Sequence, residues 1–109
     1  MTVRVAAILT SQKVNAVETV VNKLQSIHTY RFFDMEVIAG KADFVTTTSE
    51  SGCKFTFDFS KVYWNSRLHT EHARLIDQFA PGSVIVDAMA GVGPFAVPTA
   101  KRGSYVLGN

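Results

Sequence analysis

The stretch of the chain with the clearest chemical potential joins an acidic side chain to a glycine turn and a proline. Val84–Val86 are β-branched and apolar, which predicts a buried parallel strand covered on both faces. Asp87 stands at the carboxyl end of that strand. Gly91 and Gly93 allow a positive φ and a close approach of the backbone to a ligand. Pro94 suits the first turn of a helix that would direct its free N–H groups at that ligand. We therefore expect a nucleotide-like cofactor at this strand end.

The spacing of the glycines and of the acidic residue helps to distinguish between classes of cofactor. A Rossmann dinucleotide fingerprint has a third glycine, and the alanine at that position, Ala96, is sometimes allowed, so this test leaves the question open. The acidic residue four positions before the first glycine is more informative. Asp87-x-x-Ala90-Gly91-x-Gly93 resembles the first motif of S-adenosylmethionine-dependent methyltransferases. The alternative is a plain βα turn without a ligand.

Other polar residues allow simpler explanations. Glu71 falls in the first turn of an expected helix, where the helix macrodipole alone favours an acidic residue. His69 and His72 have a spacing that could suggest a metal pair, but no further ligands cluster nearby, so we expect no metal. Cys53 is the sole cysteine, which excludes an internal disulfide framework and indicates a reducing compartment. We expect it to be structural.

Composition places the chain among globular proteins. Its 109 residues suffice for one small domain at most, with 47% hydrophobic and 18% charged residues. The formal net charge of +2 permits an RNA partner without requiring one. No apolar run approaches the roughly 18 residues that span a membrane. The first nine residues lack the length and cleavage pattern of a signal peptide.

The amino-terminal half is expected to be rich in strands. Short strands are predicted over residues 3–9, 19–24 and 35–39. Residues 44–48 and 54–59 predict a hairpin around a turn at residues 50–52. Three alternating phenylalanines within the second strand of this hairpin share one face, which predicts core packing; they are Phe55, Phe57 and Phe59. Tyr63 and Trp64 could stack on a base, but we expect both to be buried in the core.

The carboxyl-terminal half is expected to alternate helices and strands. Thr70 is a candidate N-cap for a helix that reaches Phe79 and stops at Pro81-Gly82. A helix over residues 94–101 and a parallel strand over residues 105–107 follow the glycine turn. The expected fold class is α/β: a small β-rich module over residues 1–60, then the start of a Rossmann-like domain over residues 61–109. One βαβ unit is incomplete for such a sheet, so we expect a truncated domain.

Two blocks of sequence resemble a known family. Residues 57–72, Phe-Asp-Phe-Ser-Lys-Val-Tyr-Trp-Asn-Ser-Arg-Leu-His-Thr-Glu-His, and residues 90–95, Ala-Gly-Val-Gly-Pro-Phe, resemble the archaeal and eukaryotic tRNA guanine-N1-methyltransferases. These class I enzymes use S-adenosylmethionine to methylate the guanosine on the 3′ side of the anticodon. The resemblance also covers residues 20–23 and 35–40.

The resemblance implies roles for particular residues. Glu71 corresponds to the general base that removes the guanine N1 proton. Arg31 corresponds to the cation that stabilises charge developing near O6. His72 corresponds to a cofactor contact, and Lys61 and Arg67 are candidate RNA contacts. The family's cofactor turn corresponds to Asp87, Ala90, Gly91, Val92, Gly93 and Pro94. The implied partner is tRNA, the implied protein is a monomer, and the implied compartment is the cytoplasm, with the nucleus and mitochondrial matrix also possible.

The chain departs from the family pattern at both ends. The amino-terminal tRNA-recognition domain, the Asn-Pro-Pro-type segment and the acidic ribose contact are absent from the 109 residues. We therefore expect this polypeptide alone to be inactive. Two alternatives stay open: the related aminocarboxypropyl transferase of wybutosine synthesis, and a truncated RNA-binding module without enzyme activity. The run over residues 63–72 favours methyl transfer.

Overall fold

The computed structural model describes residues 17–23 and 35–109. The strand predicted over residues 3–9 and the candidate cation Arg31 lie outside these described residues. The chain divides into two units, residues 1–45 and residues 46–109, each of which is described by itself. The domain boundary expected near residue 60 stays a prediction.

An antiparallel strand pair forms the described part of the first unit. β1 (Thr19–Lys23) pairs with β2 (Met35–Gly40), with a bulge between Val20 and Val21. Both strands were predicted from their β-branched and apolar residues. Gly40 has a φ of +86°, and a Cβ there would lie 2.0 Å from the Glu18 carbonyl oxygen. This position therefore requires glycine.

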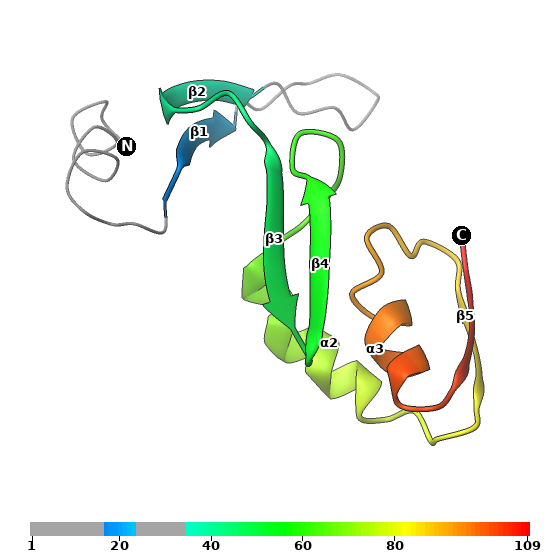
Figure 1. Cartoon of the computed structure of the whole chain (residues 1–109). Coiled ribbons are helices and arrows are strands. Elements are labelled where there is room, and N and C mark those ends of the chain that lie inside the picture. Colours follow the sequence, from blue (N-terminus) through cyan, green and yellow to red (C-terminus); the bar gives the residue numbers. More distant parts are fainter. Residues whose placement is uncertain (1–16, 24–34) are drawn as a thin grey trace. The chain divides into compact units, whose positions relative to one another are not determined.

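The predicted hairpin consists of β3 (Val45–Glu50) and β4 (Cys53–Asp58), which run in opposite directions (Figure 1). Ser51 and Gly52 form the connecting turn with φ values of +49° and +71°. Positive φ at both central residues matches the type I′ turn, whose twist suits a two-residue hairpin. The turn thus fixes the strand register that decides which side chains point inward.

An aromatic core covers one face of β4. Alternate residues of the strand, Cys53, Phe55 and Phe57, are buried together with Trp64. The ring centroids of both phenylalanines lie 5.2 Å from that of Trp64. Phe59 packs against this cluster, so the predicted phenylalanine face and the structural role of the cysteine are confirmed. The expectation for Tyr63 is wrong, because its side chain is 57% exposed.

The expected helix is shorter and begins earlier than the sequence indicated. A 3₁₀ helix, η1 (Ser66–Leu68), leads directly into α2 (His69–Ile76). The Asn65 side chain caps η1 by accepting a hydrogen bond from the Arg67 N–H. Thr70 therefore lies inside α2 and is not its N-cap, which corrects the prediction. The preceding 3₁₀ turn supplies the cap one turn upstream.

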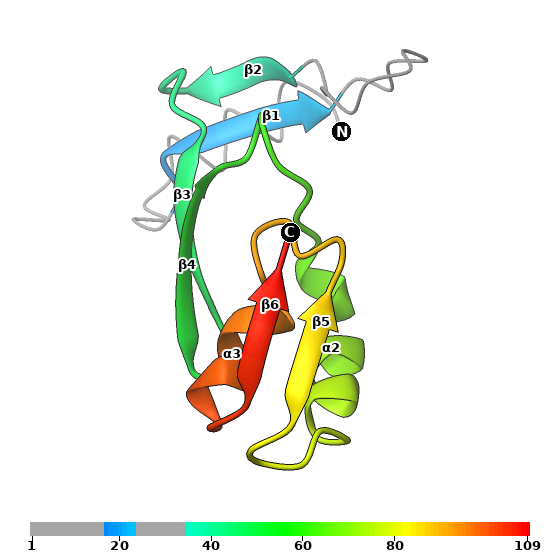
Figure 2. The ribbon, with the colours of Figure 1, turned by 90° about the vertical axis from the view of Figure 1, so that its right-hand side faces the viewer.

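A parallel βαβ unit completes the second unit. It consists of β5 (Val84–Asp87), α3 (Ala96–Lys101) and β6 (Tyr105–Gly108), with Val84 opposite Tyr105 and Asp87 opposite Gly108. Figure 2 shows the two strands side by side. The predicted strand–turn–helix–strand order is confirmed.

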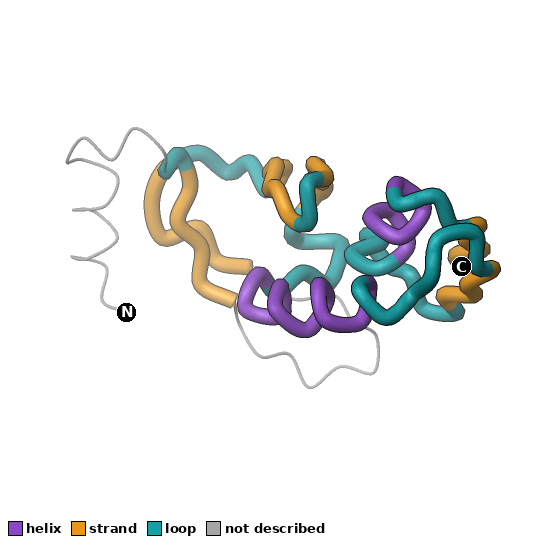
Figure 3. The backbone as a smooth tube through the Cα atoms, turned by 90° about the horizontal axis from the view of Figure 1, so that it is seen from below, coloured by secondary structure: helices purple, strands orange, loops and turns teal. Residues whose placement is uncertain are grey.

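The expectation that β5 is covered on both faces is wrong. α2 and α3 lie on the same side of the β5–β6 pair (Figures 2 and 3). Val84 and Val86 are each 69% exposed on the other face, next to exposed Tyr105 and Leu107. Within residues 35–109, no element of the second unit packs on that face. β5 is therefore covered on one face only, although its apolar sequence is typical of a strand buried on both faces.

The helix after the glycine turn begins at Ala96, two residues later than predicted. Its first hydrogen bond runs from the Val97 N–H to the Gly93 carbonyl oxygen at 3.0 Å. The next position is Pro98, which has no N–H to donate to Pro94. The helical ladder is therefore interrupted at Pro94, and the regular helix starts after it.

The aromatic core is expected to dominate the stability of the second unit. Phe55→Ala removes a buried ring that contacts Trp64, at a cost of about 3–5 kcal/mol in the free energy of unfolding. The exposed neighbour on the same strand provides the control: Lys54→Ala should change stability by less than about 0.5 kcal/mol. Denaturant unfolding followed by Trp64 fluorescence measures both; equal effects would contradict this core assignment.

Candidate functional site

The carboxyl end of β5 presents a buried carboxylate oxygen that lacks a partner. Asp87 Oδ1 accepts a weak hydrogen bond from the Met89 N–H at 3.4 Å. Asp87 Oδ2 is buried without a hydrogen-bond partner within the described residues. A buried carboxylate oxygen is costly to leave unsatisfied, so a ligand donor at this point would stabilise it.

Backbone hydrogen bonds hold the segment after Asp87 in a defined turn. The Asn109 N–H donates to the Asp87 carbonyl and the Ala90 N–H donates to the Asn109 carbonyl, both at 3.1 Å. The Gly93 N–H then donates to the Ala90 carbonyl at 2.8 Å. The β5–β6 pairing is thereby extended into the turn, which fixes Ala90 beside the end of β6.

The two turn glycines both have a positive φ but differ in their surroundings. Gly91 has a φ of +56°, and no atom lies within 4 Å of the point that a Cβ would occupy, so its surroundings are open. Gly93 has a φ of +89°, and a Cβ there would lie 3.0 Å from Val97 Cγ2. Val92, between them, packs against the aromatic core. The open space at Gly91 and the orphaned Asp87 oxygen are both compatible with the cofactor that the motif predicts.

His72 is buried where β3, α2 and the segment after the glycine turn meet. Its Nδ1 lies 2.5 Å from Glu50 Oε1, at the end of β3. Its ring packs edge-on against Phe95, with centroids 4.8 Å apart, and lies 6.4 Å from the Trp64 ring. The structure thus brings the predicted cofactor contact His72 close to the residue that follows Pro94.

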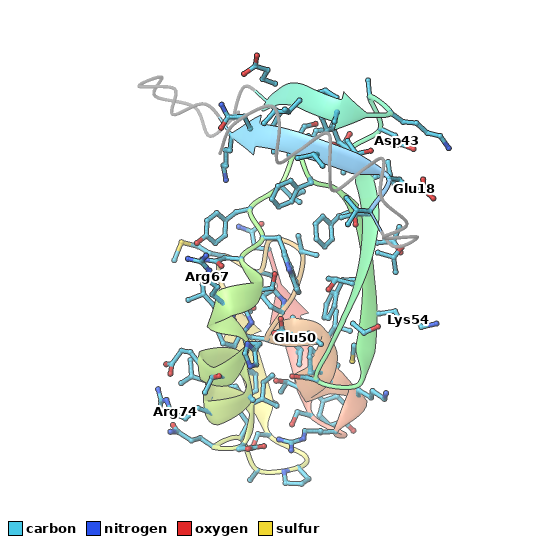
Figure 4. The ribbon with its side chains drawn as sticks, turned by 90° about the vertical axis from the view of Figure 1, so that its left-hand side faces the viewer. Glu18, Asp43, Glu50, Lys54, Arg67 and Arg74 are labelled. Atoms are coloured by element: carbon cyan, nitrogen blue, oxygen red, sulfur yellow. The ribbon has the colours of Figure 1, made fainter. Side chains whose placement is uncertain are left out.

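Glu50 is the residue of this site that the sequence did not reveal. It was assigned only to the hairpin turn. Figure 4 shows it between the hairpin and α2. Glu50 and His72 are 22 residues apart, so no helical or strand periodicity connects them. Only the packing of the hairpin against α2 creates this pair.

Glu71 lies on the outer side of α2 although His72 is its neighbour in sequence. Successive helical residues are turned by about 100°, so burial of one leaves the other near the surface. The Glu71 carboxylate is 51% exposed and pairs with Arg74 through two hydrogen bonds of 2.7 Å. These hydrogen bonds hold the pKa of Glu71 below its usual value. Figure 4 shows Arg74 at the outer surface of the helix.

The candidate RNA contacts lie upstream of α2. Lys61 pairs with Asp58 at 3.3 Å, and Arg67 is an exposed residue of η1. The His69 Nδ1–H donates a hydrogen bond of 3.0 Å to the Ser66 carbonyl oxygen in its own segment. No group of three metal-ligating side chains occurs within residues 17–23 and 35–109.

The family match covers the part of the chain that carries the candidate site. Residues 46–107 match the TRM5/TYW2 methyltransferase domain. A tRNA (guanine(37)-N(1))-methyltransferase of Cryptococcus neoformans is 68% identical over 92 residues, which are 84% of this chain and 17% of the relative. The chain thus spans less than a fifth of the length of that relative.

Solved structures share the fold. Trm5b from Pyrococcus abyssi gives a TM-score of 0.77 at 35% identity, over 93% of this chain and 30% of that protein. aTrm5, in its complex with tRNALeu, gives 0.83 at 25% identity, over 97% and 31%. TYW2 of P. horikoshii, in complex with MeSAdo, gives 0.70 at 27% identity, over 97% and 35%.

The βαβ unit with an acidic strand end and a glycine turn defines an α/β domain of the methyltransferase class. More narrowly, the chain belongs to the TRM5/TYW2 methyltransferase family. Within the described residues, no helix is long and apolar enough to cross a membrane.

The two turn glycines should respond differently to an added methyl group. Gly93→Ala combines a positive φ with a contact to Val97, whereas Gly91→Ala meets only the cost of the left-handed backbone, about 1–2 kcal/mol. We therefore expect a larger loss of unfolding free energy for Gly93→Ala. Chemical denaturation of both variants measures the difference; equal losses would show that the Val97 contact is readily relieved.

The Arg74 pair sets the ionisation of Glu71. Arg74→Gln should raise the pKa of Glu71 towards its ordinary value, because the charged hydrogen-bond donor is lost. The pair stabilises the fold fully only above the ordinary carboxyl pKa, and this contribution disappears as the pH falls through the depressed value. Because both side chains are exposed, this contribution to stability is small and decreases with added salt. NMR titration of the side-chain carboxyl carbon measures the shift; an unchanged pKa would contradict the pairing.

Proposed function

We propose that this chain forms part of a tRNA (guanine-N1)-methyltransferase that methylates the guanosine on the 3′ side of the anticodon. The strongest support is the 68% identity to a relative with that named activity, across the strand, turn and helix that carry the candidate site. The aligned aTrm5 structure contains tRNA, which supports tRNA as the partner. The proposed enzyme is a monomer of the cytoplasm, with the nucleus and the mitochondrial matrix as alternative compartments.

The proposed cofactor is S-adenosylmethionine, which supplies an activated methyl group when bound. Asp87 has an unpartnered buried oxygen that can accept a hydrogen bond from a cationic or hydroxyl donor. Gly91 leaves space above the turn. The residues that would hold the cofactor are His72, Asp87, Ala90, Gly91, Val92, Gly93 and Pro94.

The proposed general base is Glu71. The Glu71 side chain is a carboxylate at neutral pH, which is the form that accepts a proton, and the Arg74 hydrogen bonds that lower its pKa make it a weaker base. A carboxylate has about four acceptor positions, and Arg74 uses one on each oxygen. Acceptor capacity is therefore left for a guanine N–H. In this proposal Arg31 supplies the compensating positive charge, and Lys61 and Arg67 contact RNA.

Aminocarboxypropyl transfer is the second candidate function. It is supported by the TYW2 likeness, because the matched family model includes TYW2 and the TYW2 structure shares the fold. The greater identity to the guanine-N1 methyltransferase favours methyl transfer. The mass of the modified nucleoside distinguishes the two reactions.

Glu71→Gln tests the proposed base in the full-length product of the gene. Loss of the proton acceptor should reduce methyl transfer to tRNA by about 10²–10⁴-fold, while cofactor affinity is retained. Single-turnover transfer from labelled S-adenosylmethionine measures the rate, and calorimetry measures the affinity.

A matched control separates base chemistry from loss of a surface ion pair. Asp77 follows α2 and pairs with Arg102 at 2.6 Å, so Asp77→Asn also removes one exposed carboxylate charge. It should leave the transfer rate unchanged. An equal loss in both variants, or an undiminished rate in Glu71→Gln, would contradict the assignment of Glu71.

A further inference from the structure

A buried acid–imidazole pair links the hairpin to α2. The side chains of Glu50 and His72 are only 9% and 8% exposed, and Glu50 Oε1 lies 2.5 Å from His72 Nδ1. A carboxylate at that depth is costly to leave without a donor, and an N–H of the ring meets this need. None of the roles proposed above for the reaction uses Glu50.

The geometry of the ring determines what the pair leaves available. The two nitrogens of an imidazole point in different directions, and the hydrogen bond at one fixes the state of the other. Nδ1 is taken by Glu50, so Nε2 is directed away from the end of β3. The same ring packs edge-on against Phe95, two residues after Gly93. Contacts with Glu50 and Phe95 therefore restrain the rotation of the His72 ring.

We propose that Glu50 is a positioning residue for the cofactor contact of His72. Glu50 accepts a hydrogen bond from the Nδ1–H and holds the ring so that Nε2 offers its lone pair to a ligand. This inference rests on the proposed function, which assigns His72 to the cofactor. A lone pair at Nε2 accepts a hydrogen bond from an N–H or O–H donor, and S-adenosylmethionine carries both kinds of group.

Two substitutions of similar size separate positioning from packing. In Glu50→Gln the side-chain carbonyl can still accept a hydrogen bond from the Nδ1–H, whereas in Glu50→Met a side chain of similar length has no comparable acceptor. In the full-length product of the gene, we expect Glu50→Met to raise the KM for S-adenosylmethionine roughly tenfold with kcat little changed. Glu50→Gln should recover most of the wild-type value. Equal effects of the two variants would overturn the positioning role.

A spectroscopic measurement reads the tautomer without cofactor. ¹⁵N NMR of the His72 ring should show protonated Nδ1 and unprotonated Nε2 in the wild-type protein and in Glu50→Gln. Glu50→Met should give a mixture of the two tautomers. A wild-type ring protonated only on Nε2, or on both nitrogens, would overturn the proposed lone pair at Nε2.

A double-mutant cycle covers the case in which Glu50→Met alone folds poorly. If Glu50 acts through the imidazole, then in a His72→Phe background Glu50→Met causes no further loss of cofactor affinity. Additive losses would contradict this. If the wild-type protein methylates tRNA and the Glu50→Met variant binds cofactor with wild-type affinity, the positioning role of Glu50 is refuted and the proposed function stands. A wild-type protein that neither binds cofactor nor methylates tRNA would refute the proposed function, and the NMR result would still decide whether Glu50 fixes the ring.

Discussion

The buried contact between Glu50 and His72 is the interaction on which the arrangement of the candidate site depends. It joins the end of a hairpin strand to a helix, and the ring it restrains packs against Phe95 after the glycine turn. Removing either partner leaves a polar group buried without compensation, which costs more than the loss of an exposed ion pair. The Glu71–Arg74 pair begins at the residue before His72 on the same helix. Because this pair is exposed, it contributes little to the stability of the fold.

The glycine turn contributes the second constraint. The β5–β6 pairing continues through Asn109 into the turn, so backbone hydrogen bonds hold the segment around Ala90. Preorganisation of this kind lowers the cost of ordering a binding site. The strands that precede and follow this turn are less well covered. β5 and β6 have the composition of a buried parallel sheet, but their apolar side chains are exposed on one face.

Local sequence patterns predicted the parts of this fold that local physics determines. The Ser51-Gly52 turn, the phenylalanine alternation and the β5–turn–α3–β6 order follow from φ preferences and periodicity. The errors at Thr70 and Pro94 arose at helix boundaries, where Asn65 and Pro98 decide which backbone groups can pair. Glu50 could not have been predicted, because its partner is 22 residues away and only tertiary packing unites them.

We propose that this family domain serves methyl transfer to guanine N1 in tRNA. The most direct measurement is mass spectrometry of nucleosides from tRNA treated with the full-length product of the gene and S-adenosylmethionine. We predict guanosine that carries one added methyl group at N1, beside the anticodon. A guanosine derivative that carries an aminocarboxypropyl group, or tRNA left unmodified under conditions where a relative modifies it, would contradict this claim.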